Sequence, residues 1–534
     1  MHLLMIAAEC KGLAKVGGLA DVVHDLSTAL VSQGQKVHIL LPGYDLIPQA
    51  PTMANLHIPF GARTWSVEIQ KQTIGGSEVM LVRSPEFFSG TDGVVYVNSA
   101  ASGKGPFEDD ARRFAFFSTC AAYCLEDLPE LSTVDIIHCH DWHSGLVPVL
   151  TRMSGRFPQS ARKPILFTIH NLDYQGQRPL FDGGPSPFSS FSDWFPDDVH
   201  TILSHPDSGV LIDPKVPTCI NPLRAAINLA DHVSTVSPNY AQEITRPDDS
   251  DSGFLGGRGL EHDLLSKEVT GSLHGILNGI FYNEHDPGLL VPPFDRDRPA
   301  WWDGKKQHKE TLRQQIQSFS GTTESCNLIA LDNSQQFSEV PLAVAVTRVV
   351  QQKVRLLLEP LEDSRSLLHH LAQLNLNILV LGTGDLAAEL AAIGDPLPNC
   401  CFLQRFDSTL ANFIYAGGDI FLMPSDFEPC GISQMIAMRY GTVPVATAVG
   451  GLADTITNNE TGITVPVGSR LQTARDYYEA TKQISSICNT DIQGFHRLQE
   501  SSMAQRFPWE LAANKYVELY EKLQKNGVMQ GPYT

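Results

Sequence analysis

The chain has 534 residues, which is too long for a single hydrophobic core and indicates two or more domains. The 39 Lys and Arg residues are outnumbered by 59 Asp and Glu residues, and the formal net charge of −20 argues against a nucleic-acid partner or an anionic membrane surface. No apolar run is long enough to cross a bilayer, and the ten cysteines form no CxxC pair, so we expect a cytoplasmic protein without a disulfide or zinc framework.

The N-terminal segment predicts a βαβ unit. The apolar run MHLLMIAAEC is followed by the turn KVGGLAD, the helical stretch VVHDLSTALVSQGQ and the apolar run KVHILLP. The first run lacks a basic lead and a clear cleavage site, so we interpret it as a buried strand and not as a signal peptide. The turn matches neither GxGxxG nor the P-loop pattern. Lys15, with Gly17 and Gly18 at the start of a helix, still suits a phosphate or a phosphorylated sugar; the alternative is a solvated loop charge.

Polar clusters follow two later apolar strands. The segment DIIHCHDWHSG brings three histidines and Asp141 to the end of one strand, and PILFTIHNLDYQG brings His170 to the end of another. Ligands bind at this edge of an open α/β sheet, so we expect Asp141 and His143 to hydrogen-bond sugar hydroxyls. A metal site formed by His138, His140 and His143 is the alternative, which we disfavour because no carboxylate cluster lies nearby in the sequence.

The remainder of the first half contains two loop-rich segments. Residues 177–215 are rich in Pro, Phe, Asp and Ser and predict an insertion or a lid. Residues 248–259 are rich in Gly and Asp and predict a mobile loop. We expect a domain boundary near residue 271, so that the first domain spans residues 1–270 and the second spans residues 271–508.

A second α/β series starts at Pro341. The strand LAVAVTR leads to Arg348, and Lys353 follows five residues later. If the intervening loop curls back, both cations converge on one dianion, Arg through bidentate contact and Lys as a point charge. These series indicate two doubly wound α/β halves that face each other across a cleft.

Two strand-to-helix turns of the second half suit an anion. Glu428 and Cys430 follow an apolar strand, and Gly431 then opens an amphipathic helix whose first amides have no partners inside the helix. Gly450 and Gly451 repeat the arrangement after the next strand, and glycines let the backbone approach a ligand closely. The alternative is that both are ordinary turns of a parallel sheet.

These residues lie in motifs that resemble those of bacterial glycogen synthases and plant starch synthases, which transfer glucose from ADP-glucose to the non-reducing end of an α-1,4-glucan. The motifs are KVGGLADV at Lys15, HCHDWHSGL at His138, HNLDYQG at His170, TVSPNYAQEI at Thr235, NGI at Asn278, EPCGISQ at Glu428 and YGTVPVATAVGGLADT at Tyr440. The resemblance implies an α/β GT-B fold with two Rossmann-like domains, retention of anomeric configuration, and neither a metal nor a cofactor, because the nucleotide sugar is a substrate. It also implies that the helix at residues 509–534 packs back on the first domain.

The resemblance assigns site residues to three groups. The catalytic group comprises Asp141, His170, Arg348, Lys353 and Glu428. The donor-binding group comprises Lys15, Gly17, Gly18, Asn278, Gly382, Gly384, Phe406, Cys430, Gly431, Gly450 and Gly451. The acceptor-binding group comprises His143, Tyr174 and Gln175. In this assignment Arg348 and Lys353 neutralise the diphosphate leaving group, Glu428 holds the glucose hydroxyls, and Phe406 lies near the adenine.

Three residues depart from the family pattern. Val354 stands where glycine follows the Arg/Lys pair, Phe281 where aspartate follows NGI, and Val449 where threonine precedes the Gly-Gly pair. We expect Val354 to reshape the loop that presents Lys353. The leading hypothesis is an active α-glucan synthase. The alternatives are a related GT-B enzyme with another nucleotide sugar or a small acceptor, and a glucan-binding homologue with little turnover. The sequence does not indicate the nucleotide base, the acceptor length or the oligomeric state.

Overall fold

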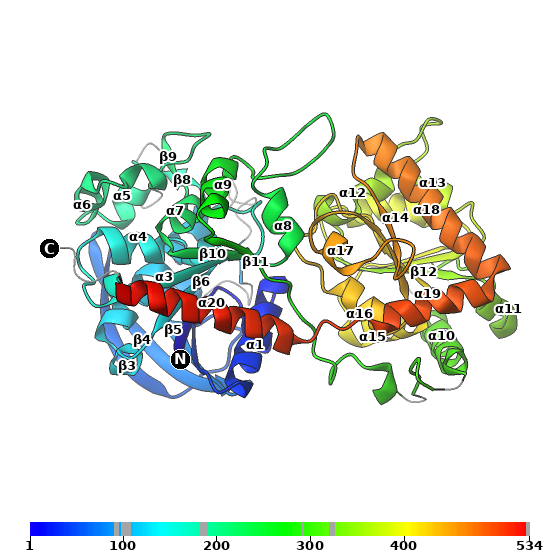
Figure 1. The fold of residues 1–534 in the computed structure, drawn as a ribbon, viewed down its shortest axis with the longest axis horizontal. Helices are drawn as coiled ribbons and strands as arrows, with labels where there is room; N and C mark the ends of the chain where they lie inside the picture. Colours follow the sequence, from blue (N-terminus) through cyan, green and yellow to red (C-terminus); the bar gives the residue numbers. More distant parts are fainter. Residues whose placement is uncertain are drawn as a thin grey trace.

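The computed structural model describes residues 1–89, 95–97, 108–181, 190–290, 293–298, 300–319 and 326–529. Two α/β domains lie side by side, and the chain passes between them twice (Figure 1). No helix in these described ranges combines the length and the apolar character that a membrane span requires.

The first domain is built on a nine-stranded sheet with the strand order β11-β10-β7-β6-β1-β2-β5-β4-β3. Its strands are β1 (His2–Ile6), β2 (Lys36–Pro42), β3 (Thr52–Phe60), β4 (Arg63–Ile74), β5 (Ser77–Arg83), β6 (Ile136–His140), β7 (Ile165–Ile169), β10 (His232–Thr235) and β11 (Leu273–Gly275). Neighbouring strands are parallel except around β4, which is antiparallel to β3 and β5. Predominantly apolar strands such as HLLMI and ILFTI are buried along their whole length, as expected for a parallel sheet that is covered on both faces.

Short connections and crossover helices complete this domain. Its helices are α1 (Gly18–Ser32), α2 (Pro85–Phe88), α3 (Glu108–Asp127), α4 (Leu146–Met153), α5 (Phe191–Trp194), α6 (Val199–Ser204), α7 (Pro222–Leu229), α8 (Pro238–Glu243) and α9 (Glu261–Val269), and a small second sheet pairs β8 (Arg178–Pro179) with β9 (Cys219–Ile220). The segment expected to be a lid contains β8, α5 and α6. Phe191 and Trp194 anchor it in the first-domain core, and residues 182–189 lie outside the described part. The described part of this segment therefore packs on the domain and does not line the cleft.

The second domain is built on a six-stranded, all-parallel sheet with the order β14-β13-β12-β15-β16-β17. Its strands are β12 (Leu342–Val346), β13 (Asn377–Leu381), β14 (Cys400–Leu403), β15 (Ile420–Met423), β16 (Val443–Thr447) and β17 (Ile463–Val465). Its helices are α10 (Trp301–Phe319), α11 (Ser334–Glu339), α12 (Gln351–Leu358), α13 (Leu367–Leu371), α14 (Ala387–Gly394), α15 (Ser408–Gly417), α16 (Ser433–Arg439), α17 (Gly450–Thr455), α18 (Arg470–Thr490) and α19 (Ile492–Ala504). Two hydrophobic clusters, one on each face, hold the helices to this sheet.

The two chain crossings between the domains lie against each other. Ile280 donates its backbone N–H to the carbonyl of Phe507 at 2.7 Å. Beyond this point α20 (Trp509–Met529) runs across the first domain, as Figure 1 shows in red. Residues 530–534 lie outside the described part. Because β11 still pairs with β10, the first sheet extends past the boundary expected at residue 270.

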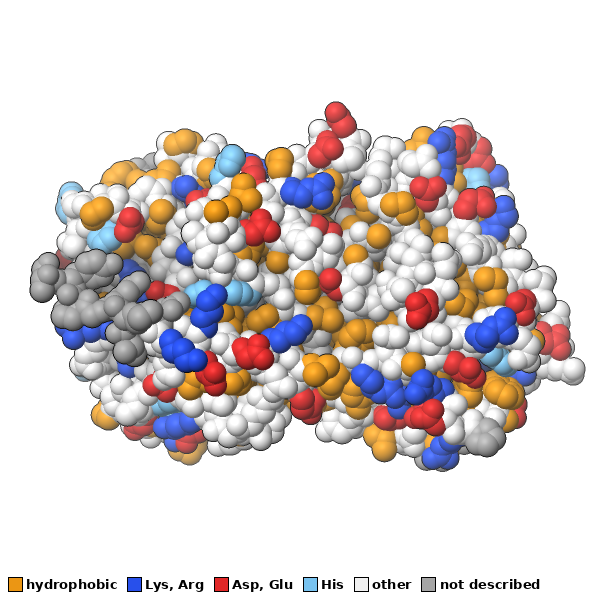
Figure 2. Space-filling view, viewed as in Figure 1, with side chains coloured by type: hydrophobic (Ala, Val, Ile, Leu, Met, Phe, Trp, Pro, Cys, Tyr) orange, Lys and Arg blue, Asp and Glu red, His pale blue; other side chains and the backbone are white. Residues whose placement is uncertain are grey.

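One covalent link differs from the expectation. Cys326 and Cys401 form a disulfide, although the scattered cysteines of the sequence did not indicate one. Residue 326 pairs with residue 401 at the edge of the second sheet, and this pairing brings together two cysteines that are 75 residues apart. On the surface shown in Figure 2, acidic and basic side chains are interspersed, and a notch in the lower edge of the view marks where the two halves meet.

Candidate active site

A cleft of about 630 Å³ lies between the two domains. Its walls are built from segments that follow the carboxyl ends of β1, β6 and β7 in the first sheet and of β12, β13, β14 and β15 in the second. This is the edge at which parallel sheets bind ligands. Fifteen of the predicted site residues line the cleft, and the four that do not are Gln175, Gly384, Gly450 and Gly451.

Lys15 borders the cleft beside Gly17 and Gly18. Its ammonium contacts Asp21 Oδ1 at 2.6 Å, and 43% of its side chain is exposed. Lys15 is therefore paired at the cleft wall and is not an isolated solvated charge. A Cβ atom added at either glycine would meet no protein atom within 4 Å. The fold does not need these glycines for packing, so their lack of side chains leaves room for a ligand.

Glu9 is a cleft residue that the sequence reasoning missed. Its Oε2 atom accepts hydrogen bonds from the backbone N–H groups of Val16 at 2.6 Å and Gly17 at 2.9 Å. Tyr96 donates its hydroxyl to the other carboxylate oxygen at 2.6 Å. A carboxylate of the protein thus occupies the amides that precede α1. The only signal in the sequence was an acidic residue at the end of an apolar run.

Asp141, which is buried, and His170, which is half-buried, form a corner of the first-domain wall. Asp141 Oδ1 accepts a hydrogen bond from the backbone N–H of His170 at 2.7 Å. The backbone of Asp141 has φ +54°, a conformation that costs a non-glycine residue energy and is concentrated at functional sites. Burial raises the pKa of Asp141 to about 7 and lowers the pKa of His170 to about 3. His170 is therefore neutral at physiological pH, whereas Asp141 titrates near it.

The neighbouring histidines are engaged inside the protein. His138 contacts Thr168 Oγ1 at 2.6 Å and Tyr520 OH at 2.9 Å. Burial lowers the pKa of His143 to about 3, and its ring stacks on Tyr96 with 5.3 Å between the ring centroids. Within the described ranges no three His, Cys, Asp or Glu side chains are grouped as metal ligands. His143 lines the cleft as a neutral ring.

Lys353 and Glu428 form an ion pair on the second-domain wall. Lys353 lies in the first turn of α12, and Arg348 precedes that helix, so both cations reach the same cleft. The start of α12 is tied to the Glu428 loop because Gln352 donates its side-chain N–H to Phe427 O at 3.1 Å. Both cations border the cleft, and Lys353 is presented by a helix start and not by the curled loop that the sequence suggested.

The glycine pair at residues 450 and 451 packs against the Glu428 loop instead of lining the cleft. A Cβ atom at Gly450 would lie 1.9 Å from Glu428 O, and one at Gly451 would lie 2.1 Å from Cys430 O. The N–H of Gly450 is already bound, because it donates to Glu243 Oε1 at 2.9 Å. Of the two helix starts that looked alike in sequence, only the one opened by Gly431 borders the cleft.

Two further predicted residues have packing roles. Gln175 points away from the cleft, and its Oε1 accepts a hydrogen bond from Asn221 Nδ2 at 2.6 Å. A Cβ at Gly384 would lie 2.3 Å from Val349 O, so this glycine permits a close backbone approach behind the cleft wall. Tyr174, the neighbour of Gln175, does border the cleft and is 45% exposed.

Cys430 and Phe406 differ strongly in exposure although both border the cleft. The Cys430 thiol is buried, and burial raises its pKa to about 12, so it is not a reactive thiolate. Phe406 is 83% exposed at the rim, where its ring is available for stacking. Asn278 also borders the cleft; its side chain is buried, and it belongs to the segment that joins the domains.

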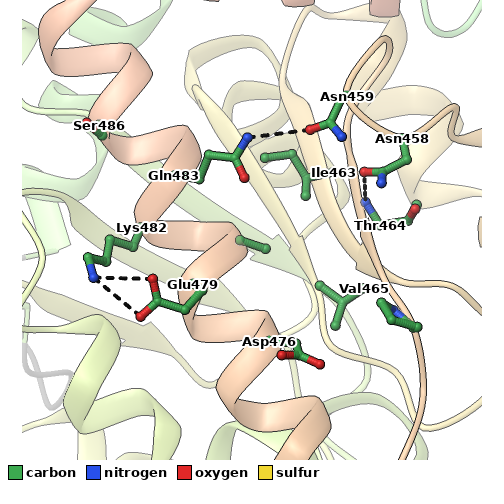
Figure 3. A pocket seen from close by; sticks show the side chains of 12 residues that line it. Asn458, Asn459, Ile463, Thr464, Val465, Asp476, Glu479, Lys482, Gln483 and Ser486 are labelled. Carbon is green, nitrogen blue, oxygen red and sulfur yellow. Dashed lines mark hydrogen bonds and ion pairs between the residues drawn. The ribbon is translucent and has the colours of Figure 1, made fainter.

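A second hollow of about 470 Å³ lies in the second domain between β17 and α18 (Figure 3). Asn459 and Gln483 border it and are joined by a hydrogen bond of 3.5 Å. Glu479 and Lys482 on α18 pair with each other. None of the predicted site residues lines this hollow, so we assign the chemistry to the cleft between the domains.

Models of two known families match the chain. The starch synthase catalytic domain matches residues 2–266, and glycosyl transferases group 1 matches residues 341–483. A glycogen synthase of Streptococcus sanguinis (strain SK36) is 32% identical over 98% of this chain and 100% of its own length. The chain belongs to the glycogen synthase family. Another glycogen synthase, from Aeromonas salmonicida (strain A449), is 31% identical and is aligned over 98% of both chains.

Solved structures agree with this family. The catalytic domain of starch synthase IV from Arabidopsis thaliana, bound to ADP and acarbose, matches with a TM-score of 0.78 and 29% identity over 98% of this chain and 99% of that chain. A sucrose-phosphate synthase from Thermosynechococcus elongatus shares the fold, with a TM-score of 0.57 and 18% identity over 98% of this chain and 99% of that chain. The predicted GT-B fold of this glycogen synthase family member is confirmed.

The three departures from the glycogen synthase pattern are accommodated by packing. Val354 lies inside α12 with its side chain in the second-domain core, so the helix needs no glycine there. Val449 is buried before α17, whose start does not border the cleft. Phe281 packs against the first-domain core. The expectation that Val354 reshapes a loop is wrong, because Lys353 and Val354 both lie in the continuous helix α12.

Proposed function

We propose that the protein is a retaining glycosyltransferase that transfers glucose from ADP-glucose to the non-reducing end of an α-1,4-glucan. The observation that carries the proposal is the cleft that brings Arg348, Lys353 and Glu428 together with Asp141 and His170 in a full-length relative of glycogen synthases. The ADP bound to the starch synthase IV catalytic domain supports an adenine nucleotide as the donor.

The second-domain wall suits the leaving group of the donor. When the bond between the sugar and the phosphate breaks, negative charge grows on the departing oxygen, so cations that face it lower the barrier. Arg348 and Lys353 supply two positive charges to this side of the cleft. Because Lys353 also pairs with Glu428, one ammonium links the diphosphate side to a carboxylate that can accept hydrogen bonds from glucose hydroxyls.

The first-domain wall suits the sugar and the acceptor. In the proposed step the acceptor hydroxyl attacks the anomeric carbon from the face that the diphosphate leaves, the bond from carbon to phosphate oxygen breaks with its electron pair, and the hydroxyl proton passes to that oxygen. This route needs no protein nucleophile. Asp141 and the neutral His170 then face a sugar that gains positive character. Exclusion of water by the two domains protects the donor from hydrolysis.

The decisive experiment measures nucleoside diphosphate release from ADP-glucose, UDP-glucose and GDP-glucose, each with and without glycogen. We expect strong turnover only when ADP-glucose and glycogen are both present. Turnover with another donor, or without glycogen, would replace the proposal by a related GT-B transferase. No turnover with any donor, together with glycogen binding, would show a glucan-binding homologue.

The proposed reaction uses no metal and no cofactor. We therefore expect turnover to be unchanged after dialysis against EDTA and after subsequent addition of Mg²⁺ or Mn²⁺. A loss of turnover in EDTA that is reversed by one of these ions would contradict this part of the proposal.

A further inference from the structure

Helix α8 of the first domain contacts the second domain next to the cleft. Ser237, the residue before α8, donates its hydroxyl to the backbone carbonyl of Pro429 at 2.7 Å. At the other end of the helix, Glu243 accepts the N–H of Gly450 at 2.9 Å. Between them, the backbone N–H of Asn239 donates to Asp454 Oδ2 at 2.9 Å. Three hydrogen bonds therefore join one short helix to the opposite domain.

Two of these bonds hold the Glu428 loop. One reaches Pro429 in the loop itself, and the other reaches Gly450, whose neighbour Gly451 binds the Glu428 carbonyl. Pro429 follows Glu428 in the chain, and Ser237 is completely buried where it binds the Pro429 carbonyl. Gly451 donates its N–H to the carbonyl of Glu428 at 3.0 Å, and the preceding residue is the one held by Glu243. The backbone on both sides of the Glu428–Pro429 peptide is thus held from outside the loop.

The bonds are of kinds that are costly to lose. A buried carbonyl deprived of its donor is left unsatisfied, and a bond between a carboxylate and a backbone N–H is stronger than a neutral one. Glu243 is 8% exposed, and Asn239 Nδ2 also donates to its Oε1 at 2.7 Å. The carboxylate is therefore held in place by its own helix before it reaches across to Gly450.

We propose that Ser237 and Glu243 are positioning residues that fix the Glu428 loop from the opposite domain. In this proposal, the contact between α8 and the second domain is required for Glu428 and its partner Lys353 to be correctly positioned on the donor side of the cleft. The kinetic part of this inference rests on the proposed function, whereas the structural part concerns the order of the loop itself.

The test compares Ser237→Ala, Glu243→Ala and Glu243→Gln with the wild type. Thr245→Ala is the matched control, because the Thr245 hydroxyl donates to Gln242 O at 2.8 Å, one turn back in its own chain, and makes no hydrogen bond to the second domain in the part of the chain that the structure describes. Ser237→Ala also removes the acceptor of the Tyr240 N–H, and Glu243→Ala removes that of Asn239 Nδ2, but both of these bonds lie within α8. We expect each substitution to lower kcat about 5- to 10-fold, the effect of losing the one buried hydrogen bond that reaches the opposite domain, with KM for donor and glycogen changed less than about twofold. Glu243→Gln keeps the acceptor oxygen and should recover most of the loss.

A double-mutant cycle separates positioning from general destabilisation. If Ser237 acts through the Glu428 side chain, Ser237→Ala should have little further effect on kcat in a Glu428→Gln background, because the group that it positions is already altered. A full additional 5- to 10-fold loss in that background would overturn the inference. So would an unchanged kcat in both Ser237→Ala and Glu243→Ala.

Hydrogen–deuterium exchange of the peptide covering residues 424–433 provides a readout that needs no turnover. We expect faster exchange of this peptide in Ser237→Ala than in Thr245→Ala or the wild type. Equal exchange in all three proteins would overturn the inference whether or not the enzyme is active. If the wild type turns over none of the three donors, the proposed function fails, and the exchange result alone decides whether α8 orders the loop.

Discussion

The substitution Gly451→Ala tests the packing of the Glu428 loop with a single methyl group. The new Cβ would lie 2.1 Å from Cys430 O and 2.5 Å from Cys430 Cα, both of which are backbone atoms. A carbon and an oxygen that are not bonded approach to about 3.2 Å, so one backbone must move by about 1 Å. The loop that bears Glu428 is the side expected to be displaced, because it borders the cleft whereas α17 packs against α8.

A displacement of this size at a catalytic group costs about 10²-fold in rate, and it would also weaken the bond from Gly451 N–H to Glu428 O. We expect kcat for ADP release to fall about 10²-fold at saturating ADP-glucose and glycogen, while KM for glycogen changes less than about threefold. Circular dichroism and size-exclusion chromatography check that the variant is folded.

Gly468→Ala is the control in the same domain. The nearest atom to its Cβ would be Gln472 Cβ at 4.0 Å, an ordinary contact, so wild-type kcat is expected. The reasoning would be refuted by a folded Gly451→Ala enzyme with kcat within about threefold of the wild type. An equal loss in Gly468→Ala would show that the effect is not specific to the Glu428 loop.

Three other outcomes are expected. The methyl group of Gly18→Ala meets no protein atom and would project into the space proposed for the donor, so it should raise KM for ADP-glucose about 10-fold without lowering Tm. A lower Tm with an unchanged KM would contradict this interpretation of the open space. Lys353→Ala removes the leaving-group cation and the partner of Glu428, so kcat should fall about 10²-fold or more while glycogen binding, measured by co-sedimentation, is retained. Burial raises the pKa of Asp141 to about 7 in the folded state, against about 4 in the unfolded state. The folded state therefore binds the proton more tightly, and the protein loses stability as the pH rises from about 4 to 7. The Tm of Asp141→Asn minus that of the wild type should therefore increase over this range, and a difference independent of pH would argue against the shifted pKa.

The architecture could be predicted from the sequence because most of the parallel strands are apolar runs that are followed by polar residues. The sites at Asp141, His170 and Glu428 all follow such runs, and the topology brings those ends to one cleft. Adjacent residues were harder to separate. Tyr174 borders the cleft and Gln175 supports Asn221, a difference set by the direction of each side chain and not by its type.

Tertiary contacts decided what the sequence could not. The helix starts at Gly431 and Gly450 have similar local patterns, but the second is occupied by Glu243, which lies 207 residues away in the chain. Glu9 was missed for the same reason, because its role depends on the backbone amides of Val16 and Gly17, which come back to it across the turn that follows β1. The Cys326–Cys401 bridge likewise depends on a pairing of distant segments.

The position of α20 has a consequence for the order in which the protein is made. Trp509, Tyr516 and Tyr520 belong to the hydrophobic core of the first domain, yet they are synthesised after the whole second domain. The domain that is synthesised first is therefore the one that is completed last. A nascent chain that ends at residue 508 would carry a finished second domain beside a first domain with an open core, and a protein cut at this boundary would keep that defect permanently.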